Sequence, residues 1–168
     1  MRDDGIRIDR LTAGDWERLR AIRLRALADA PDSFGVTLAR AEQRSVESWE
    51  EGLERLATFV ATRQGVDVGL VRGAPDPDSP DGAWLISMWV APEGRGLGAG
   101  DALIDSVIDW ARAEGRRRLM LDVGDANAHA IALYDRKGFK PTGHTGCLAP
   151  PREHITEHRR ERILVETP

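Results

Sequence analysis

The sequence predicts an α/β fold, in which one domain spanning residues 1–168 has a mixed sheet flanked by helices. Three observations predict it. Trp84–Val90 is a continuous apolar run, interrupted at Ser87, which suits a central strand buried on both faces. Leu97–Glu114 carries apolar residues at helical spacing, as expected of a helix with one buried face. Strand and helix patterns also alternate along the chain, with no linker dividing it.

The first elements are a short strand and two helices. Alternation at Ile6–Ile8 predicts the strand. The spacing of Thr12 and Asp15 resembles a capping box at the start of a helix, which should end before Pro31, because the residue preceding a proline disfavours helical angles. A second helix is expected over Ser45–Leu56.

Strands dominate the middle of the chain. Thr58–Thr62 and Val66–Val71 predict a hairpin turning at Gln64–Gly65. Ala74–Gly82 holds three prolines and three aspartates, and is expected to be a surface loop. The elements expected after the buried strand are the helix Leu97–Glu114, the strand Leu119–Val123, the helix Ala128–Lys137, and the strands Phe139–Thr142 and Arg160–Val165.

Composition narrows the function classes. A net charge of −4 at pH 7 gives no reason to expect nucleic acid as a partner. The single cysteine, Cys147, excludes an internal disulfide and is expected to lie in a loop. No apolar run approaches the roughly 20 residues that span a bilayer, and the start does not lead into a signal-peptide core. We therefore expect a cytoplasmic protein with no membrane partner.

The most informative segment is the glycine-rich turn of residues 90–100, between the buried strand and an amphipathic helix. Glycines leave successive amide N–H groups uncovered, and a helix N-terminus adds positive potential, so a diphosphate is a suitable ligand. Arg95 can add a charge-assisted hydrogen bond. A tight turn without a ligand is the alternative. The spacing Gly96-x-Gly98-x-Gly100 differs from the Rossmann pattern, and no Gly-Lys-Ser or Gly-Lys-Thr of a Walker loop occurs.

Two blocks of sequence resemble the GNAT acetyltransferases. The first is Val90-x-Pro92-x-x-Arg95-Gly96-x-Gly98-x-Gly100, which is similar to the family's R/Q-x-x-G-x-G/A cofactor signature. The second, Asn127 to Tyr134 followed by Gly138-Phe139, is similar to its N-x-x-A-x-x-x-Y-x-x-x-G-F block. The segment Arg23–Gly35 resembles the acceptor-side region of many small members.

The resemblance implies a GNAT-like fold whose mostly antiparallel sheet is splayed at the cofactor site. It implies acetyl-CoA as the acyl donor, with no metal. Backbone groups of Met88 and Val90 would bind the pantetheine arm, and Asn127 would hold the cofactor from a neighbouring loop. The pyrophosphate would lie on the loop formed by Arg95, Gly96, Leu97, Gly98, Ala99 and Gly100. Asn127 also suits a helix N-cap, and both roles are compatible.

Tyr134 is the candidate general acid, because the departing thiolate of coenzyme A needs a proton and the motif places this tyrosine to supply it. The general base stays open. The central strand has no acidic residue, and the candidates are Asp122, Asp125, His129 and His144. An amine that arrives neutral, or that loses its proton through water, would need none of them. Phe34 and Trp84 are weak candidates for the acceptor pocket.

The predicted function is N-acetyl transfer from acetyl-CoA to a primary amine, by direct attack in a ternary complex. The alternative is a non-catalytic module of the same fold that senses acyl-CoA. The sequence leaves open a small-molecule amine or a protein amino group as acceptor, and family habit suggests a homodimer. His154 and His158 do not match the metalloprotease motif H-E-x-x-H, so no metal site is expected.

Overall fold

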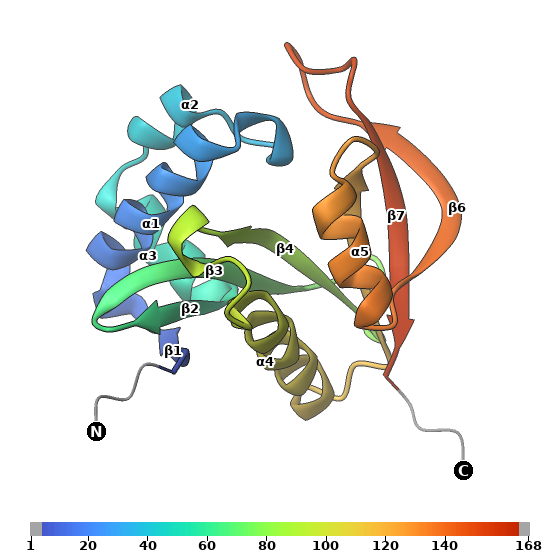
Figure 1. The fold of residues 1–168 in the computed structure, drawn as a ribbon, viewed down its shortest axis with the longest axis horizontal. Helices are drawn as coiled ribbons and strands as arrows, with labels where there is room; N and C mark the ends of the chain where they lie inside the picture. Colours follow the sequence, from blue (N-terminus) through green and yellow to red (C-terminus); the bar gives the residue numbers. More distant parts are fainter. Residues whose placement is uncertain (1–4, 165–168) are drawn as a thin grey trace.

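The computed structural model describes residues 5–164, which form a seven-stranded sheet with helices on both faces (Figure 1). The strand order is β1-β2-β3-β4-β5-β7-β6. The β4–β5 pair is parallel and every other neighbouring pair is antiparallel. The predicted mixed, mostly antiparallel sheet is confirmed. Its strands are β1 (Arg7–Leu11), β2 (Ala57–Arg63), β3 (Val66–Pro75), β4 (Gly82–Val90), β5 (Arg118–Gly124), β6 (Lys140–Cys147) and β7 (Thr156–Ile163).

Helices pack on both sides of β3. A Cβ on Gly73 would lie 2.5 Å from the ring of Trp110, so this glycine lets α4 approach the sheet closely. Arg72 has the opposite orientation along the strand and lies against Gly52 of α3. Figure 1 shows α1, α2 and α3 gathered at one end of the molecule, and α5 with β6 and β7 at the other. The helices are α1 (Trp16–Asp29), α2 (Leu38–Glu42), α3 (Val46–Arg55), α4 (Ala99–Ala113) and α5 (Ala128–Arg136).

The core forms where α4 crosses the sheet. The predicted stripe of α4 is buried, with Leu103, Ile104 and Val107 each 0% exposed. Complete burial of an aliphatic side chain of this size stabilises a protein by about 1.5–3 kcal/mol. This packing fixes the start of α4 against the central strands, and the start of α4 is where the glycine-rich turn ends.

The predicted beginning and end of α1 are confirmed. The Asp15 carboxylate accepts a hydrogen bond from the Thr12 backbone N–H at 2.8 Å, within a short 3₁₀ turn that leads into the helix. Leu19 and Ile22 of α1 are buried, and the helix ends at Asp29, two residues before Pro31. The C-terminus of α1 is therefore fixed in position at Asp29, the residue that bonds the glycine-rich turn.

Several boundaries differ from the predictions. Strand β1 covers Arg7–Leu11 rather than Ile6–Ile8, and β3 continues to Pro75, into the segment expected to be loop. The short helix α2 was not predicted, because five residues cannot show a helical period; the Thr37 side chain caps it by accepting from Arg40 N–H at 3.3 Å.

Strand β4 is central, as predicted, but it is not fully buried on both faces. Leu85 and Trp89 are buried, whereas Trp84 and Ile86 are half-buried. The expected loop position of Cys147 is wrong, because β6 runs to this residue by pairing Cys147 with Thr156 of β7. Val165, the predicted end of the last strand, lies outside the described residues.

Candidate functional site

The glycine-rich turn has the backbone geometry of an anion-binding helix start. A 3₁₀ turn at Pro92–Gly94 follows β4, and α4 begins at Ala99. Gly96 and Gly98 have φ values of +73° and +84°, which side-chain-bearing residues rarely adopt. Ala102 donates a helical hydrogen bond to the Gly98 carbonyl at 3.1 Å. The amides that precede Ala102 have no intrahelical acceptor, so they are free to bind a ligand.

Strand β4 separates from β5 directly before this turn. The parallel ladder holds three residue pairs, the last of which is Trp84↔Met120. Beyond it β4 contains a bulge: three residue steps from Ile86 to Trp89 oppose two steps on β3, and Ser87 has a φ of +58°. An extra residue bends the strand that contains it. The separation leaves the β5-facing backbone of Met88 and Val90 without a neighbouring strand.

The Arg95 side chain points back to α1. Its Nε donates to the Val90 carbonyl oxygen at 3.1 Å, and its Nη2 donates to Asp29 Oδ2 at 3.1 Å. The same Asp29 oxygen accepts from Trp89 Nε1 at 2.9 Å. The guanidinium thus ties the turn to the end of α1 and to the end of β4. A direct contact between this side chain and a pyrophosphate would require it to exchange partners.

The second half of α5 lies beside the start of α4, and Arg136 Nη2 donates to Asp101 Oδ2 at 2.9 Å. The Asn127 side chain caps α5 by accepting from Ala130 N–H at 3.3 Å, which confirms the N-cap role and leaves its amide NH₂ available. A Cβ on Gly100 would lie 3.0 Å from Leu133 Cδ2, so this glycine permits the close approach of the two helices. Next to it, Ala99 is buried, whereas the Leu97 side chain is exposed.

Tyr134 of α5 is buried against Phe139, with the two rings edge to face and their centroids 5.9 Å apart. Among residues 5–164 we find no hydrogen bond to its hydroxyl group. Burial raises the pKa of Tyr134 above that of an ordinary tyrosine, so the phenol stays protonated across the physiological pH range. A protonated phenol beside a leaving thiolate can donate a proton or a hydrogen bond.

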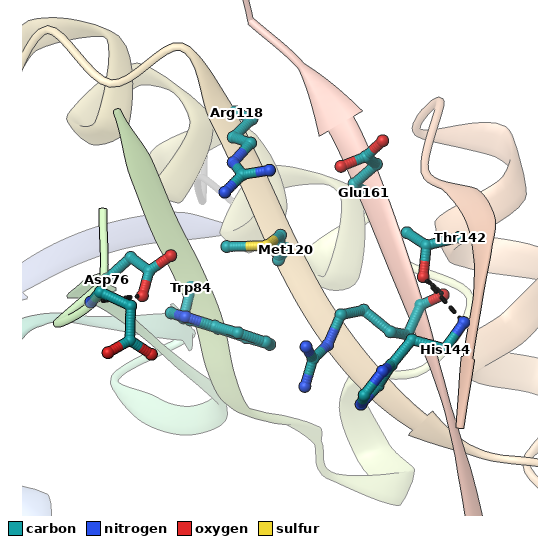
Figure 2. A pocket seen from close by; sticks show the side chains of 9 residues that line it. Asp76, Trp84, Arg118, Met120, Thr142, His144 and Glu161 are labelled. Carbon is teal, nitrogen blue, oxygen red and sulfur yellow. Dashed lines mark hydrogen bonds between the residues drawn. The ribbon is translucent and has the colours of Figure 1, made fainter. Parts of the chain in front are cut away.

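A cavity of about 440 Å³ lies on the sheet face that carries Trp84. It includes both members of the last β4–β5 pair, Trp84 and Met120, so it lies where the two strands begin to separate. Figure 2 shows Asp76 and Trp84 on one side of the cavity, His144 on the other and Met120 between them. The lining is completed by Asp78, Arg118, Thr142, Arg159 and Glu161.

The side chains of β4, β5 and β7 form a connected surface at this cavity. The Arg159 guanidinium lies over the Trp84 ring, 4.6 Å from its centroid, and its Nε donates to Asp122 Oδ1 at 3.0 Å. An arginine held by a carboxylate fixes the orientation of the indole beneath it. The structure thus places Trp84 in a cavity, as the acceptor-pocket prediction requires.

Phe34 has a different environment from Trp84. It is 5% exposed, belongs to the core, and is not a residue lining this cavity. The Arg152 guanidinium, from the loop between β6 and β7, donates to the backbone carbonyl oxygens of Pro31, Phe34 and Gly35. Phe34 therefore helps to join the α1–α2 connection to the β6–β7 loop, and any contribution to acceptor binding would be indirect.

The candidate bases lie apart from one another. Asp122 is bonded to Arg159, whereas Asp125 lies 4.0 Å from His158 on a different part of the surface. His144 lines the cavity, and His129 is exposed on α5. None of these four contacts Tyr134 in the hydrogen bonds and ring contacts found among residues 5–164.

Sequence reasoning missed Glu157 of β7. This carboxyl group is half-buried, and burial followed by repulsion from Asp122 raises its pKa, while Arg152 opposes the rise. Two-residue alternation along β7 places Glu157 on the same face as Arg159 and Glu161. The sequence predicts that this strand begins at Arg160, so Glu157 was not expected to lie in a strand.

Three further features bear on metal binding, cysteine chemistry and membrane insertion. Residues 5–164 contain no group of three or more His, Cys, Asp or Glu side chains arranged to hold a metal ion. Cys147 is an exposed free thiol. In the same range, no helix has both the length and the apolar character required to cross a membrane.

A family comparison accounts for the turn, the splayed strands and the tyrosine together. Residues 19–139 match the model of the acetyltransferase (GNAT) family. The chain belongs to the GNAT family. The match covers the glycine-rich turn, the bulged strand and the α5 segment with Asn127 and Tyr134. Membership and the acetyltransferase names of relatives support an acyltransferase.

The curated relatives are named as acetyltransferases. A mycothiol acetyltransferase from Thermobispora bispora is 33% identical over 142 residues, which cover 81% of this chain and 47% of that protein. The chain thus spans about half the length of these curated relatives.

Solved structures of acetyltransferases share the fold. A ribosomal-protein-alanine N-acetyltransferase from Brucella melitensis superposes with a TM-score of 0.76 at 26% identity, covering 94% of this chain and 99% of that one. The yncA protein from Salmonella typhimurium, solved with its cofactor acetyl-CoA, superposes with a TM-score of 0.74 at 18% identity. That match covers 97% of this chain and 96% of the other.

Proposed function

We propose that this GNAT protein is an N-acetyltransferase that moves an acetyl group from acetyl-CoA to a primary amine. One observation carries the proposal: β4 bulges and leaves β5 directly before a glycine-rich helix start. Unpaired strand backbone suits the amide-containing pantetheine arm, and free helix N-terminal amides suit the pyrophosphate. Few ligands other than coenzyme A combine an amide-rich arm with a diphosphate.

The residues present fit acetyl-CoA. The positions where Cβ atoms on Gly96 and Gly98 would stand have no other atom within 4 Å, so the turn is open to a ligand on that side. Met88 and Val90 would bond the pantetheine amides, and Asn127 would use its free NH₂ group. The Val90 carbonyl already accepts from Arg95, so its contribution would come through its N–H or after Arg95 moves.

The transfer step uses Tyr134 as the acid. The amine nitrogen attacks the thioester carbonyl carbon, the carbon–sulfur bond breaks, and the departing thiolate takes a proton from the phenol. The amine loses its own proton to water or to a carboxylate, and solvent returns a proton to Tyr134. The raised pKa of Tyr134 supports the role, because a neutral phenol is the form that donates.

We place the acceptor at the cavity beside Trp84, because this cavity begins where β4 and β5 separate. Its lining includes the carboxylates of Asp76, Asp78 and Glu161, which suit a primary ammonium group. The named relatives include a mycothiol acetyltransferase and a ribosomal-protein-alanine N-acetyltransferase. Both a small molecule and a protein amino group are therefore acceptor classes to test.

The test is an acceptor screen. The protein is incubated with acetyl-CoA and a panel of small amines and peptides, and the release of free coenzyme A thiol is measured. Acceptor-dependent release that fails with Tyr134→Phe is the expected result. Tight acetyl-CoA binding with no release across the panel would favour the acyl-CoA sensor and reject the enzyme.

A further inference from the structure

Of the five buried side-chain nitrogens that lack a hydrogen-bond acceptor in residues 5–164, three come from elements that pack together. They are Arg23 Nη1 in α1, Trp49 Nε1 in α3 and Arg72 Nη2 in β3. Arg23 and Arg72 are only 7% and 6% exposed, and Trp49 is 2% exposed. An unpaired buried donor costs about 1–3 kcal/mol, and more when it is charged. Such groups call for an explanation.

These side chains share one region between α1, α3 and the sheet. Arg72 Nε donates to Thr58 Oγ1 at 3.0 Å, and its Nη2 lies 3.0 Å from where a Cβ on Gly52 would stand. Gly52 is one helical turn after Trp49, so both lie on the same side of α3.

Two stacked arginines extend this group. The Arg23 guanidinium lies over the Phe34 ring at 4.7 Å, and the Arg44 guanidinium lies over the Trp49 ring at 5.2 Å. We call Arg23, Arg44, Trp49 and Arg72 the arginine cluster.

The arginine cluster carries positive charge without a counter-ion. No ion pair found among residues 5–164 involves Arg23, Arg44 or Arg72. Burial lowers the pKa of Arg23 and of Arg72 to about 10, and repulsion from Arg44 adds to both effects. Both guanidinium groups are therefore still charged at pH 7. Buried like charges without a partner are strongly unfavourable.

We infer that the arginine cluster is an internal binding site for one small anion, a halide or a single carboxylate group. Guanidinium and indole N–H groups donate hydrogen bonds and accept none. The oxygen of a water molecule accepts at most two hydrogen bonds, whereas a small anion accepts from all sides. The site lies on the opposite side of β3 from α4, because Arg72 faces α3 and Gly73 faces α4. It is therefore separate from the glycine-rich turn.

Bromide provides a direct probe. Crystals of the protein grown with sodium bromide should show an anomalous scattering peak within hydrogen-bonding distance of Arg23 and Arg72. Water density without a bromide peak at the arginine cluster would overturn the inference. This experiment uses the unmodified chain, so it does not depend on whether any variant folds.

Thermal unfolding separates the possible anions. The unfolding temperature is measured in sodium chloride, sodium bromide and sodium acetate, against a buffer of equal ionic strength whose anion is the bulky HEPES sulfonate. A saturable rise of about 2–4 °C is expected at an anion concentration about five times Kd. A rise with halides alone identifies a halide site, and a rise with acetate identifies a carboxylate site. Equal unfolding temperatures in all four salts would contradict the inference.

Matched variants locate the effect. Arg72→Met keeps the apolar stem and removes the charge, so the anion-dependent rise should disappear. Because the unpaired charge is removed as well, the unfolding temperature in the HEPES buffer should not fall. Arg55→Met, on the exposed side of α3, should keep the full anion response. An anion response that persists in Arg72→Met would assign it to another place on the protein.

Discussion

Asp29 Oδ2 lies 3.1 Å from Arg95 Nη2 and joins the end of α1 to the glycine-rich turn. The same oxygen accepts from Trp89 Nε1, on the strand that precedes the turn. One carboxylate therefore binds both the end of β4 and the glycine-rich turn. This relationship links the acceptor-side helix to the cofactor turn.

Asp29→Asn should weaken acetyl-CoA binding. The neutral amide keeps the size of the side chain but loses the charge-assisted bond to Arg95, so the turn is held less firmly. Loss of about 1 kcal/mol corresponds to a Kd for acetyl-CoA raised about fivefold. Calorimetric titration measures it. Asp32→Asn, at an exposed carboxylate in the α1–α2 connection, is the control, and an equal effect there would argue against the link.

Gly98→Ala should destabilise the turn. Gly98 has a φ of +84°, and an alanine in the left-handed region costs about 1–2 kcal/mol. We expect a lower free energy of unfolding by denaturant and weaker acetyl-CoA binding. Gly14→Ala is the control, because its added Cβ would meet nothing within 4 Å and its φ is not left-handed. A Gly98→Ala protein as stable as the wild type would show that the turn adopts another backbone conformation.

Tyr134→Phe should lower kcat and leave the fold intact. The ring keeps its burial and its edge-to-face contact with Phe139, while the proton donor is lost. General acid catalysis contributes about 10²–10⁴-fold, so kcat should fall at least about a hundredfold. Thiol release at saturating substrates measures kcat, and circular dichroism checks the unfolding temperature. Unchanged kcat with chemistry still rate-limiting would remove Tyr134 from the mechanism.

Glu157→Gln should change how stability depends on pH. Burial raises the pKa of Glu157 in the folded protein, so the folded state binds its proton more tightly than the unfolded state does. The wild type should lose stability as pH rises from the ordinary glutamate pKa near 4.5 through the raised value. The variant lacks this loss, so its advantage should grow over that range and then level off. Denaturant unfolding between pH 4 and pH 8 measures it.

The control for this prediction is Glu153→Gln, at an exposed carboxyl group in the β6–β7 loop. Its unfolding curves should follow those of the wild type at each pH. If the difference between Glu157→Gln and the wild type is the same at every pH, then Glu157 does not titrate in the way its burial implies.

The order of most strands and helices was predictable because the apolar periodicity of long elements is local. The stripe Leu103, Ile104, Val107 of α4 and the apolar run of β4 are visible in the sequence and buried in the structure. The short helix α2 could not be predicted, because five residues show no helical period. The strands β6 and β7 were predicted too short, because polar strands such as Lys140–Cys147 show no apolar alternation.

Motif spacing predicted the glycine-rich turn and singled out Tyr134 as the candidate acid. The partners of individual side chains could not be predicted, because they depend on tertiary contacts. Nothing near Arg95 in the sequence indicates that its guanidinium bonds Asp29, 66 residues away. The pairing of Asp122 with Arg159 and the half-burial of Glu157 likewise depend on the pairing of β5 with β7. Sequence-distant partners of this kind determine the acceptor side, which is why the sequence alone does not identify the base.

Calorimetric titration of the folded protein with acetyl-CoA and with S-acetylpantetheine tests the central claim most directly. Both carry the thioester and the amide arm, but only acetyl-CoA carries the pyrophosphate that the amides at the start of α4 are proposed to bind. The account predicts saturable binding of acetyl-CoA, at least about tenfold tighter than that of S-acetylpantetheine. Equal affinities, or no binding of either molecule, would contradict it.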